Sequence, residues 1–309
     1  MNVSMVIPLF NEADSLPELH TRLASVLVAA ASDFEIIFID DGSSDSSLAV
    51  LAGLQHNDPK VKVISFRRNY GKAAALCVGF AEATGEVVFT MDADLQDDPK
   101  EIPRFIEKLN EGYDLVSGWK KKRHDPLGKR LPSKLFNWAT SWLVGLKLHD
   151  YNCGFKAYRN EVVKEVAVYG EMHRYIPALA HVKGFRVTEI TVEHHARQHG
   201  KSKYGLERLT RGFLDLLTVV FMGKYKTRPL HLFGGIGLLV FSAGCVIDGY
   251  ILSLWVRFGN IQNRAPLLML GVLLTILGIQ FISTGLLAEM ITGMSVPQPT
   301  DYSVKRRLG

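Results

Sequence analysis

The segment VVFTMDADLQDDP, residues 87–99, decides how this 309-residue chain folds. It begins with an apolar run and passes at once into four carboxylates within seven residues. An apolar run that ends in polar, turn-forming residues is typical of a buried strand in a parallel sheet. In open α/β sheets the polar residues that follow such strands collect where ligands bind, beyond the carboxyl ends of the strands.

The same pattern continues on both sides of this segment. Apolar runs predict strands at 3–7, 35–39, 61–66, 86–91 and 113–117, and amphipathic stretches predict helices at 15–30, 45–55, 72–83 and 99–110. Strands that alternate with helices predict an α/β fold with a Rossmann-like, mostly parallel sheet covered on both faces.

Charge and cysteine content narrow the environment of the protein. The net charge of +5 and the isoelectric point of about 9.0 indicate an anionic partner: nucleic acid, a phosphorylated small molecule or a lipid surface. Cys77, Cys153 and Cys245 are far apart, so neither a disulfide framework nor a zinc site is expected, and a reducing cytosolic face fits best. The polar residues Asn11 and Glu12 interrupt the N-terminal apolar run before it reaches the length of a signal peptide. This run is therefore expected to be the first core strand.

Two later segments are long enough to cross a bilayer. Residues 231–256 carry one formal charge, Asp248, and residues 265–288 carry none. A buried hairpin in a soluble protein is the alternative, but both segments are apolar around the whole helix. For Asp248 we expect a structural partner in another helix or protomer, and a direct catalytic role is the alternative. Five glycines are either sites of close helix contact or ordinary helix positions: Gly234, Gly235, Gly237, Gly271 and Gly278.

Basic residues outside the two spans exceed those in the short turn between them. By the positive-inside rule this predicts that the large N-terminal region and both termini are cytoplasmic, in a multi-pass inner-membrane protein. The basic residues are Lys224, Lys226, Arg228, Lys305, Arg306 and Arg307 outside, against Arg257 and Arg264 in the turn.

Four polar loops follow the first four predicted strands and are expected to line one crevice: residues 8–12, 40–45, 67–72 and 92–98. Residues 40–45 are also explained by a turn with a helix cap. Asp97 and Asp98, just before Pro99, suit a helix N-terminus. Asp92 and Asp94 have no such explanation, and two carboxylates at a strand end suit a divalent cation shared with substrate phosphates.

Six motifs in order resemble those of family 2 glycosyltransferases: VIPLFNE (6–12), IDDGS (39–43), NYGK (69–72), DADLQ (92–96), DYNCGF (150–155) and RQHGKSK (197–203). The chain is most similar to the polyprenyl-phosphate branch, which includes dolichyl-phosphate mannose synthase and the bacterial GtrB and ArnC enzymes. The resemblance extends over the first region and the two-helix hairpin.

This resemblance implies a GT-A fold and an inverting transfer of a sugar from a nucleotide-sugar to a polyprenyl phosphate with Mg²⁺ or Mn²⁺. A UDP-sugar and undecaprenyl phosphate are favoured, and GDP-mannose transfer of the dolichyl-phosphate mannose synthase type is the alternative. A processive polysaccharide synthase would need more membrane helices and a Q-x-x-R-W motif. A non-catalytic nucleotide-binding membrane scaffold would have no use for the acidic and basic motifs together.

The family pattern also implies roles for individual residues. Donor contacts fall on Pro8, Asn11, Glu12, Asp41, Lys72, Asp92, Ala93 and Gln96. Metal binding falls on Asp92, Asp94 and Gln96, and lipid-phosphate binding on Lys120, Lys129, Ser133, Arg197, Ser202 and Lys203. The catalytic set is Asp94, Asp150 and Arg197, where Asp150 acts as a base or only orients the acceptor or a sugar hydroxyl.

The acceptor side has its own sequence signal. Residues 120–134 are basic and are followed by Trp138 and Trp142, which predicts a segment that meets a lipid phosphate at the membrane surface; a solvated charge run is the alternative. His194, His195 and His199 have no cysteine or carboxylate at standard zinc spacing, so zinc is not expected.

The predicted organisation is a catalytic domain at 1–204, an amphipathic juxtamembrane helix at 205–228, a transmembrane hairpin at 229–292 and a tail at 293–309. Expected partners are the donor, the lipid acceptor and the bilayer, with a homotetramer through the hairpins and no nucleic acid.

Overall fold

In a computed structural model, the described residues are 1–121, 140–141, 144–166, 168, 170, 172–195, 218, 221, 225, 228–261 and 263–294. They form two compact units, one up to Thr218 and one from Phe221. Most of the predicted basic segment 120–134, of the predicted juxtamembrane helix 205–228 and of the tail 293–309 lies outside the described residues. The same holds for the site residues Lys129, Ser133, Arg197, Ser202 and Lys203.

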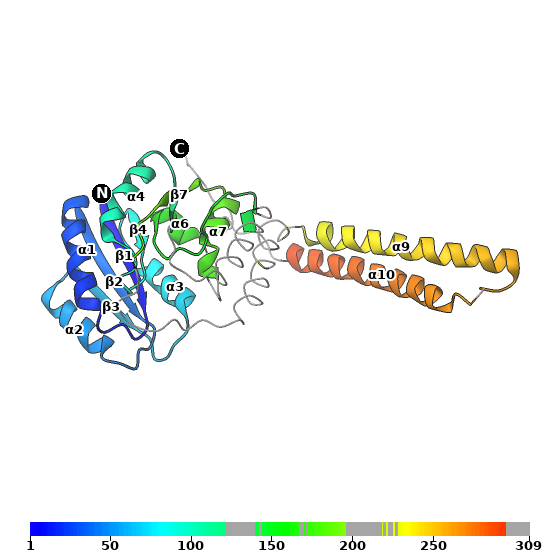
Figure 1. The fold of residues 1–309 in the computed structure, drawn as a ribbon, viewed down its shortest axis with the longest axis horizontal. Helices are drawn as coiled ribbons and strands as arrows, with labels where there is room; N and C mark the ends of the chain where they lie inside the picture. The colour runs from blue at the N-terminus through cyan, green and yellow to red at the C-terminus, as the bar shows by residue number, and fades with distance from the viewer. Residues whose placement is uncertain are drawn as a thin grey trace. The chain divides into compact units, whose positions relative to one another are not determined.

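The first unit contains a seven-stranded sheet in the order β3-β2-β1-β4-β6-β5-β7 (Figure 1). All neighbouring pairs are parallel except the two that include β6, which runs against β4 and β5. The strands are β1 (Asn2–Leu9), β2 (Asp33–Asp40), β3 (Val61–Ser65), β4 (Val87–Thr90), β5 (Leu115–Trp119), β6 (Lys156–Arg159) and β7 (Val187–Thr191).

Helices cover both faces of this sheet because side chains of buried strands alternate between the faces. Met5 and Ile7 of β1 pack in a core with α1, α2 and α4, whereas Val6 packs in a second core with α3, α6 and α7. The helices are α1 (Leu16–Ala30), α2 (Ser47–Asn57), α3 (Lys72–Glu82), η1 (Pro99–Glu101), α4 (Ile102–Asn110), α6 (Asn160–Glu165), η2 (Met172–Arg174) and α7 (Ile176–Val182).

The structure confirms the five predicted strands, the four predicted helices and the mostly parallel sheet. The prediction missed β6, β7, α6 and α7. β6 has only four residues and two of them, Lys156 and Arg159, are basic, so its sequence lacks an apolar run. The strand forms because the edges of β4 and β5 supply hydrogen-bonding partners on both sides.

The second unit is a hairpin of α9 (Pro229–Phe258) and α10 (Ala265–Met294). Each helix has 30 residues, which corresponds to about 45 Å at 1.5 Å per residue. By length and composition, both are long and apolar enough to span a membrane, and most of their large apolar side chains are exposed.

Glycines spaced by seven residues let these two helices approach closely. A Cβ atom on Gly244 would lie 2.6 Å from the backbone nitrogen of Thr275, and one on Gly278 would lie 2.5 Å from that of Phe241. Gly237 and Gly271 are similarly crowded by the facing helix. Gly234 and Gly235 are not, so of the five glycines considered, these two are ordinary helix positions.

The polar groups of the hairpin also find partners in the opposite helix. The Thr275 hydroxyl donates to Asp248 Oδ2 over 3.2 Å, which confirms the expected interhelical partner for Asp248. Near the other end, Glu289 Oε2 accepts from the Leu230 backbone N–H over 3.1 Å. Glu289 thereby satisfies one of the unpaired amides at the start of α9.

Candidate active site

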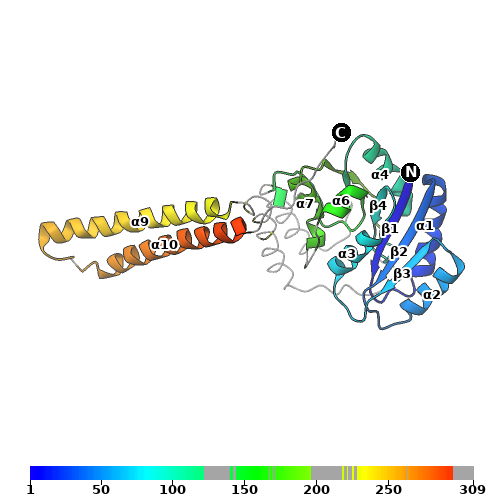
Figure 2. The ribbon, with the colours of Figure 1, turned by 180° about the vertical axis from the view of Figure 1, so that it is seen from behind.

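The polar loops lie at one edge of the sheet because β1 to β5 and β7 all run in the same direction (Figure 2). Their carboxyl ends therefore share an edge. β6 runs in the opposite direction, so its first residue, Lys156, pairs with Thr90 at the end of β4 and lies at that same edge.

The first two loops are tied together by hydrogen bonds. Asn11 has a left-handed backbone conformation (φ 58°), and its side-chain oxygen accepts from the Ser44 N–H over 2.8 Å. The Asn11 N–H donates to Ser43 Oγ over 2.9 Å, and the Glu12 N–H to Ser47 Oγ over 3.0 Å. Strained non-glycine conformations concentrate at functional sites. Pro8 is buried within β1.

Asp41 holds the third loop in place. Its carboxylate accepts from the backbone N–H groups of Tyr70, over 2.7 Å, and Gly71, over 2.9 Å. Asp41 is 5% exposed. In this arrangement both carboxylate oxygens face the third loop, and they position the start of α3, where Lys72 stands.

Lys72 forms an ion pair with Asp92 Oδ1 at the end of β4. Burial by itself would raise the pKa of Asp92, but the Lys72 ammonium, together with Lys120 and His173, lowers that pKa to about 2. The other side of the carboxylate lies against Gly154, where a Cβ atom would stand 2.4 Å from Asp92 Oδ2. The absence of a side chain at position 154 therefore makes room for Asp92.

The rest of the DADLQ motif folds into a tight turn. Asp94 is 8% exposed, and its Oδ1 accepts from the Gln96 N–H over 3.2 Å. Leu95 has a left-handed conformation (φ 59°) although its side chain is buried. For a bulky residue this conformation is a true outlier, and such outliers are typical of functional sites. Ala93 is 3% exposed and packs in the core under the loop.

The next two carboxylates differ from each other. Asp98 caps η1 by accepting from the Lys100 N–H over 3.0 Å, as predicted. The capping prediction is wrong for Asp97, whose side chain is fully buried and lies 2.8 Å from Lys120 Nζ. Lys120, which we expected at the lipid phosphate, thus neutralises Asp97 in this structure.

Asp150 lies in the loop between β5 and β6. It is 1% exposed, and its Oδ1 accepts from the Asn152 N–H over 3.0 Å, a contact typical of a carboxylate that shapes its own loop. The preceding residue, His149, stacks on Trp119 with ring centroids 4.0 Å apart and also binds Glu189 of β7. These contacts hold the loop against the end of β5.

Two basic residues near Asp92 were missed by sequence reasoning: Lys156, which is buried, and His173, which is partly buried. Burial lowers the pKa of Lys156 to about 8 and that of His173 to about 2. Lys156 donates to the Cys153 carbonyl. Neither residue carried a signal in the sequence, because the four-residue strand that positions Lys156 lacks an apolar run.

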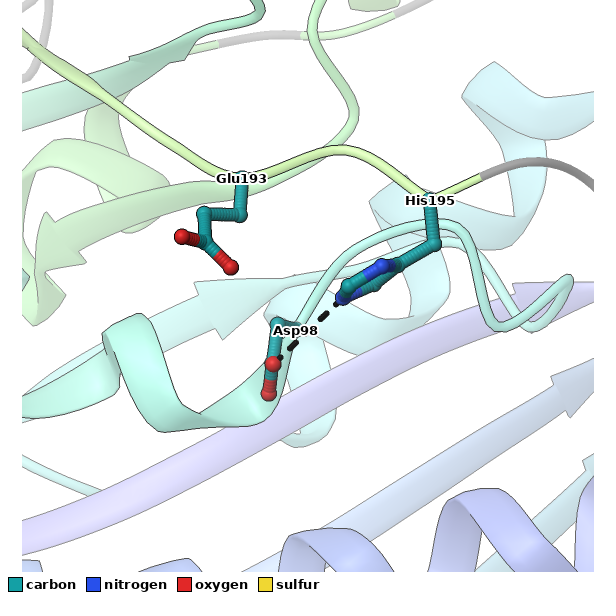
Figure 3. A group of neighbouring side chains, drawn as sticks. All are labelled: Asp98, Glu193 and His195. Atoms are coloured by element: carbon teal, nitrogen blue, oxygen red, sulfur yellow. Dashed lines mark hydrogen bonds and ion pairs between the residues drawn. The ribbon is translucent and has the colours of Figure 1, made fainter.

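Asp98, Glu193 and His195 lie close to one another at the surface of this edge (Figure 3). Their ligand atoms are all within 4.8 Å, so the fold supplies carboxylates that the spacing of the histidines did not indicate. Asp98 Oδ2 and His195 Nε2 are 3.5 Å apart as an ion pair, and Glu193 and His195 are exposed.

The site agrees with a known family. Residues 4–167, more than half of the chain, match the family model described as Glycosyl transferase family 2. The chain belongs to glycosyltransferase family 2. In this family 2 glycosyltransferase the matched region begins in β1 and ends just beyond α6, so it includes the DADLQ and DYNCGF motifs.

Two curated relatives of this family 2 glycosyltransferase align over 94% of the chain. Dodecaprenyl-phosphate galacturonate synthase of Rhizobium johnstonii is 40% identical over 296 residues, which cover 88% of that protein. Undecaprenyl-phosphate 4-deoxy-4-formamido-L-arabinose transferase of Pseudomonas aeruginosa is 37% identical over 294 residues, or 85% of its length.

Solved structures share the fold. Glucosyl-3-phosphoglycerate synthase from Mycobacterium tuberculosis, in a complex with Mn²⁺, UDP-glucose and phosphoglyceric acid, aligns with a TM-score of 0.52 at 17% identity. The alignment covers 72% of this chain and 79% of that one. With Mn²⁺, UDP and phosphoglyceric acid bound, the TM-score is 0.55 at 16% identity, over 72% and 78% of the two chains. The first unit therefore has the GT-A fold.

Proposed function

We propose that this glycosyltransferase transfers a sugar from a UDP-sugar to undecaprenyl phosphate, with inversion at the anomeric carbon, and so makes a lipid-linked monosaccharide. The observation that carries the proposal is the similarity over 94% of the chain to two enzymes whose names both contain a polyprenyl phosphate acceptor. The two names differ in the sugar, so the sugar itself stays open.

The donor end of the site fits a divalent metal. Asp92 and Asp94 offer carboxylate oxygens two residues apart at a strand end, beside Lys72. Mg²⁺ and Mn²⁺ prefer such oxygen ligands, and Mg²⁺ commonly uses one or two carboxylates with substrate phosphates completing the shell. Asp92 and Asp94 would hold the metal, with Gln96 next to them. When bound, the metal would supply charge stabilisation for the departing diphosphate.

The chain's own cations serve the same leaving group. Lys72 is placed by the third loop, which Asp41 holds through two backbone N–H groups. A cation fixed before the reaction stabilises developing negative charge without reorganisation. Pro8, Asn11, Glu12 and Asp41 would bind the nucleoside.

The acceptor is already a nucleophile. A phosphate monoester with a second pKa near 6 is mostly dianionic at neutral pH, so it needs positioning more than deprotonation. Lys129, Ser133, Arg197, Ser202 and Lys203 would hold this phosphate, and Asp150 would orient the acceptor or a sugar hydroxyl.

The two apolar helices support a location at a membrane. A hairpin that crosses the bilayer would keep the active site at the surface where a lipid-borne phosphate lies, with the first unit and both termini in the cytoplasm. A homotetramer formed through the hairpins remains our proposal for assembly.

The proposed reaction is tested by incubating the purified full-length protein with labelled nucleotide-sugars and either undecaprenyl or dolichyl phosphate. The panel comprises UDP-glucose, a UDP-N-acetylhexosamine, UDP-galacturonic acid, UDP-aminoarabinose and GDP-mannose. We expect organic-extractable label from a UDP-sugar with undecaprenyl phosphate. If none of the donors in the panel gives organic-extractable label in the presence of Mg²⁺ or Mn²⁺, the proposal is contradicted.

The metal assignment is tested by Asp94→Asn. We expect this variant to lose transfer by at least about a hundredfold, because a metal-bridged leaving group is worth several kcal/mol. Its thermal unfolding midpoint should stay close to that of the unaltered protein. Full turnover with the same divalent-ion requirement would exclude Asp94 as a ligand.

A further inference from the structure

A short antiparallel ribbon joins the loop after β4 to the segment after β7. The His195 backbone N–H donates to the Gln96 backbone carbonyl over 2.9 Å, and the Gln96 side-chain Nε2 donates to the His195 carbonyl over 3.4 Å. Asp97 and His194 form the antiparallel bridge between these contacts. One strand of the ribbon, residues 96–97, begins two residues after Asp94. The other strand, residues 194–195, ends two residues before the acceptor motif at 197–203.

Asp97 lies at the centre of this ribbon. Its side chain is 0% exposed, and its Oδ1 is 2.8 Å from Lys120 Nζ and 3.8 Å from His194 Nδ1. Lys120 immediately follows β5, and His194 follows β7. A single carboxylate thus contacts two segments that are far from it in the sequence, one after β5 and one after β7.

The charge of Asp97 is kept by these neighbours. Burial by itself would raise the pKa of Asp97, but Lys120 and His194 outweigh burial and lower it. Burial by itself would lower the pKa of Lys120, but nearby groups, Asp97 first among them, raise it. Because removal of one partner from a buried pair leaves an uncompensated charge, the pair resists separation.

We propose that Asp97 is a positioning residue for the lipid phosphate: it attaches the acceptor segments that begin at Lys120 and His194 to the loop that carries Asp92 and Asp94. This inference rests on the proposed function. Asp97 itself is buried and does not touch the acceptor. Its loss should therefore weaken binding of the lipid phosphate without weakening binding of the nucleotide to the same extent.

The test is Asp97→Asn in the full-length protein in detergent, with two binding measurements. Titration calorimetry with UDP and Mn²⁺ reports the donor side, and fluorescence titration with undecaprenyl phosphate reports the acceptor side. We expect the dissociation constant for undecaprenyl phosphate to rise about tenfold or more, within the usual range of coupling between sites, and that for UDP to change less than about twofold. Asp98→Asn is the matched control. It removes the neighbouring charge and its 3.5 Å ion pair with His195 but keeps the Asp97–Lys120 pair, and it should change neither dissociation constant by more than about twofold.

Asp97→Asn leaves Lys120 buried and unpaired, so His194→Ala provides a second variant that keeps the Asp97–Lys120 pair. His194→Ala should also raise the dissociation constant for undecaprenyl phosphate severalfold. The unfolding midpoint of this variant should equal that of the unaltered protein. Unchanged affinity for the lipid in either folded variant would overturn the inference, as would an equal loss of both affinities. If the unaltered protein binds UDP but no undecaprenyl phosphate, the proposed function fails and the inference fails with it.

Discussion

Replacing Gly154 with alanine is expected to disable the donor side of the site without unfolding the protein. The added Cβ would stand 2.4 Å from Asp92 Oδ2 and 2.8 Å from Asp92 Cγ, where ordinary contact begins at 3.4 Å. Gly154 has no left-handed backbone, so alanine fits its conformation. The obstructing atoms are the end of a side chain, so the Asp92 carboxylate moves and the backbone stays.

The distances give the size of the effect. To restore ordinary contact, Asp92 Oδ2 must move by about 1 Å, and an error of about 1 Å in a reacting arrangement costs about a hundredfold in rate. That factor corresponds to about 2.7 kcal/mol of transition-state stabilisation. We expect kcat/KM for transfer to undecaprenyl phosphate to fall by about this factor, whereas the free energy of unfolding changes by less than about 1 kcal/mol.

The assay pairs steady-state transfer with titration calorimetry of UDP and Mn²⁺ and with thermal unfolding. Gly53→Ala is the matched control, because a Cβ atom at Gly53 in α2 meets nothing within 4 Å. It should leave transfer unchanged. If Gly154→Ala transfers sugar and binds the metal–nucleotide pair as the unaltered protein does, the position of Asp92 is irrelevant to the donor and our assignment is wrong.

Three further outcomes are expected. Hydrogen bonds and Lys62 lower the pKa of Glu35 to about 2 against the effect of burial, so Glu35→Gln should cost about 1–2 kcal/mol of unfolding free energy at pH 7, and urea titrations should show this cost disappearing as the pH falls from about 4.5 to 2. Gly278→Ala should lower the unfolding midpoint in detergent because its Cβ meets backbone, whereas Gly249→Ala, in open space, should not. Lys129→Ala should raise KM for undecaprenyl phosphate more than KM for the UDP-sugar, and an unchanged lipid KM would remove Lys129 from the acceptor site.

Much of the first unit was predictable because periodicity is a local property. Each of the strands β1 to β5 is indicated by an apolar run of a few residues, and the amphipathic stretches between these runs indicate helices. β6 and β7 were not predicted because they are short and carry charged residues. Their hydrogen-bonding partners, β4 for β6 and β5 for β7, are distant in the sequence, so no local pattern reveals the pairing.

The hairpin shows the same limit. Continuous apolar sequence was enough to predict both helices, which have 30 residues each. Their length is what indicates that each could span a bilayer. Which glycines lie between the helices was not decided by composition. Gly237 and Gly235 are two residues apart, yet only Gly237 faces α10, because residues so close in a helix point in different directions.

By itself, the sequence determined the α/β fold, the two apolar helices and the aspartates at the end of β4, since each follows from neighbours along the chain. Only the tertiary structure decided what each aspartate meets. Asp97 and Asp98 have the same local chemistry before Pro99, yet Asp98 caps η1 while Asp97 pairs with Lys120. The physical reason is that a buried charge must be neutralised by whichever opposite charge the sheet order brings within reach, and strand order cannot be read from local pattern.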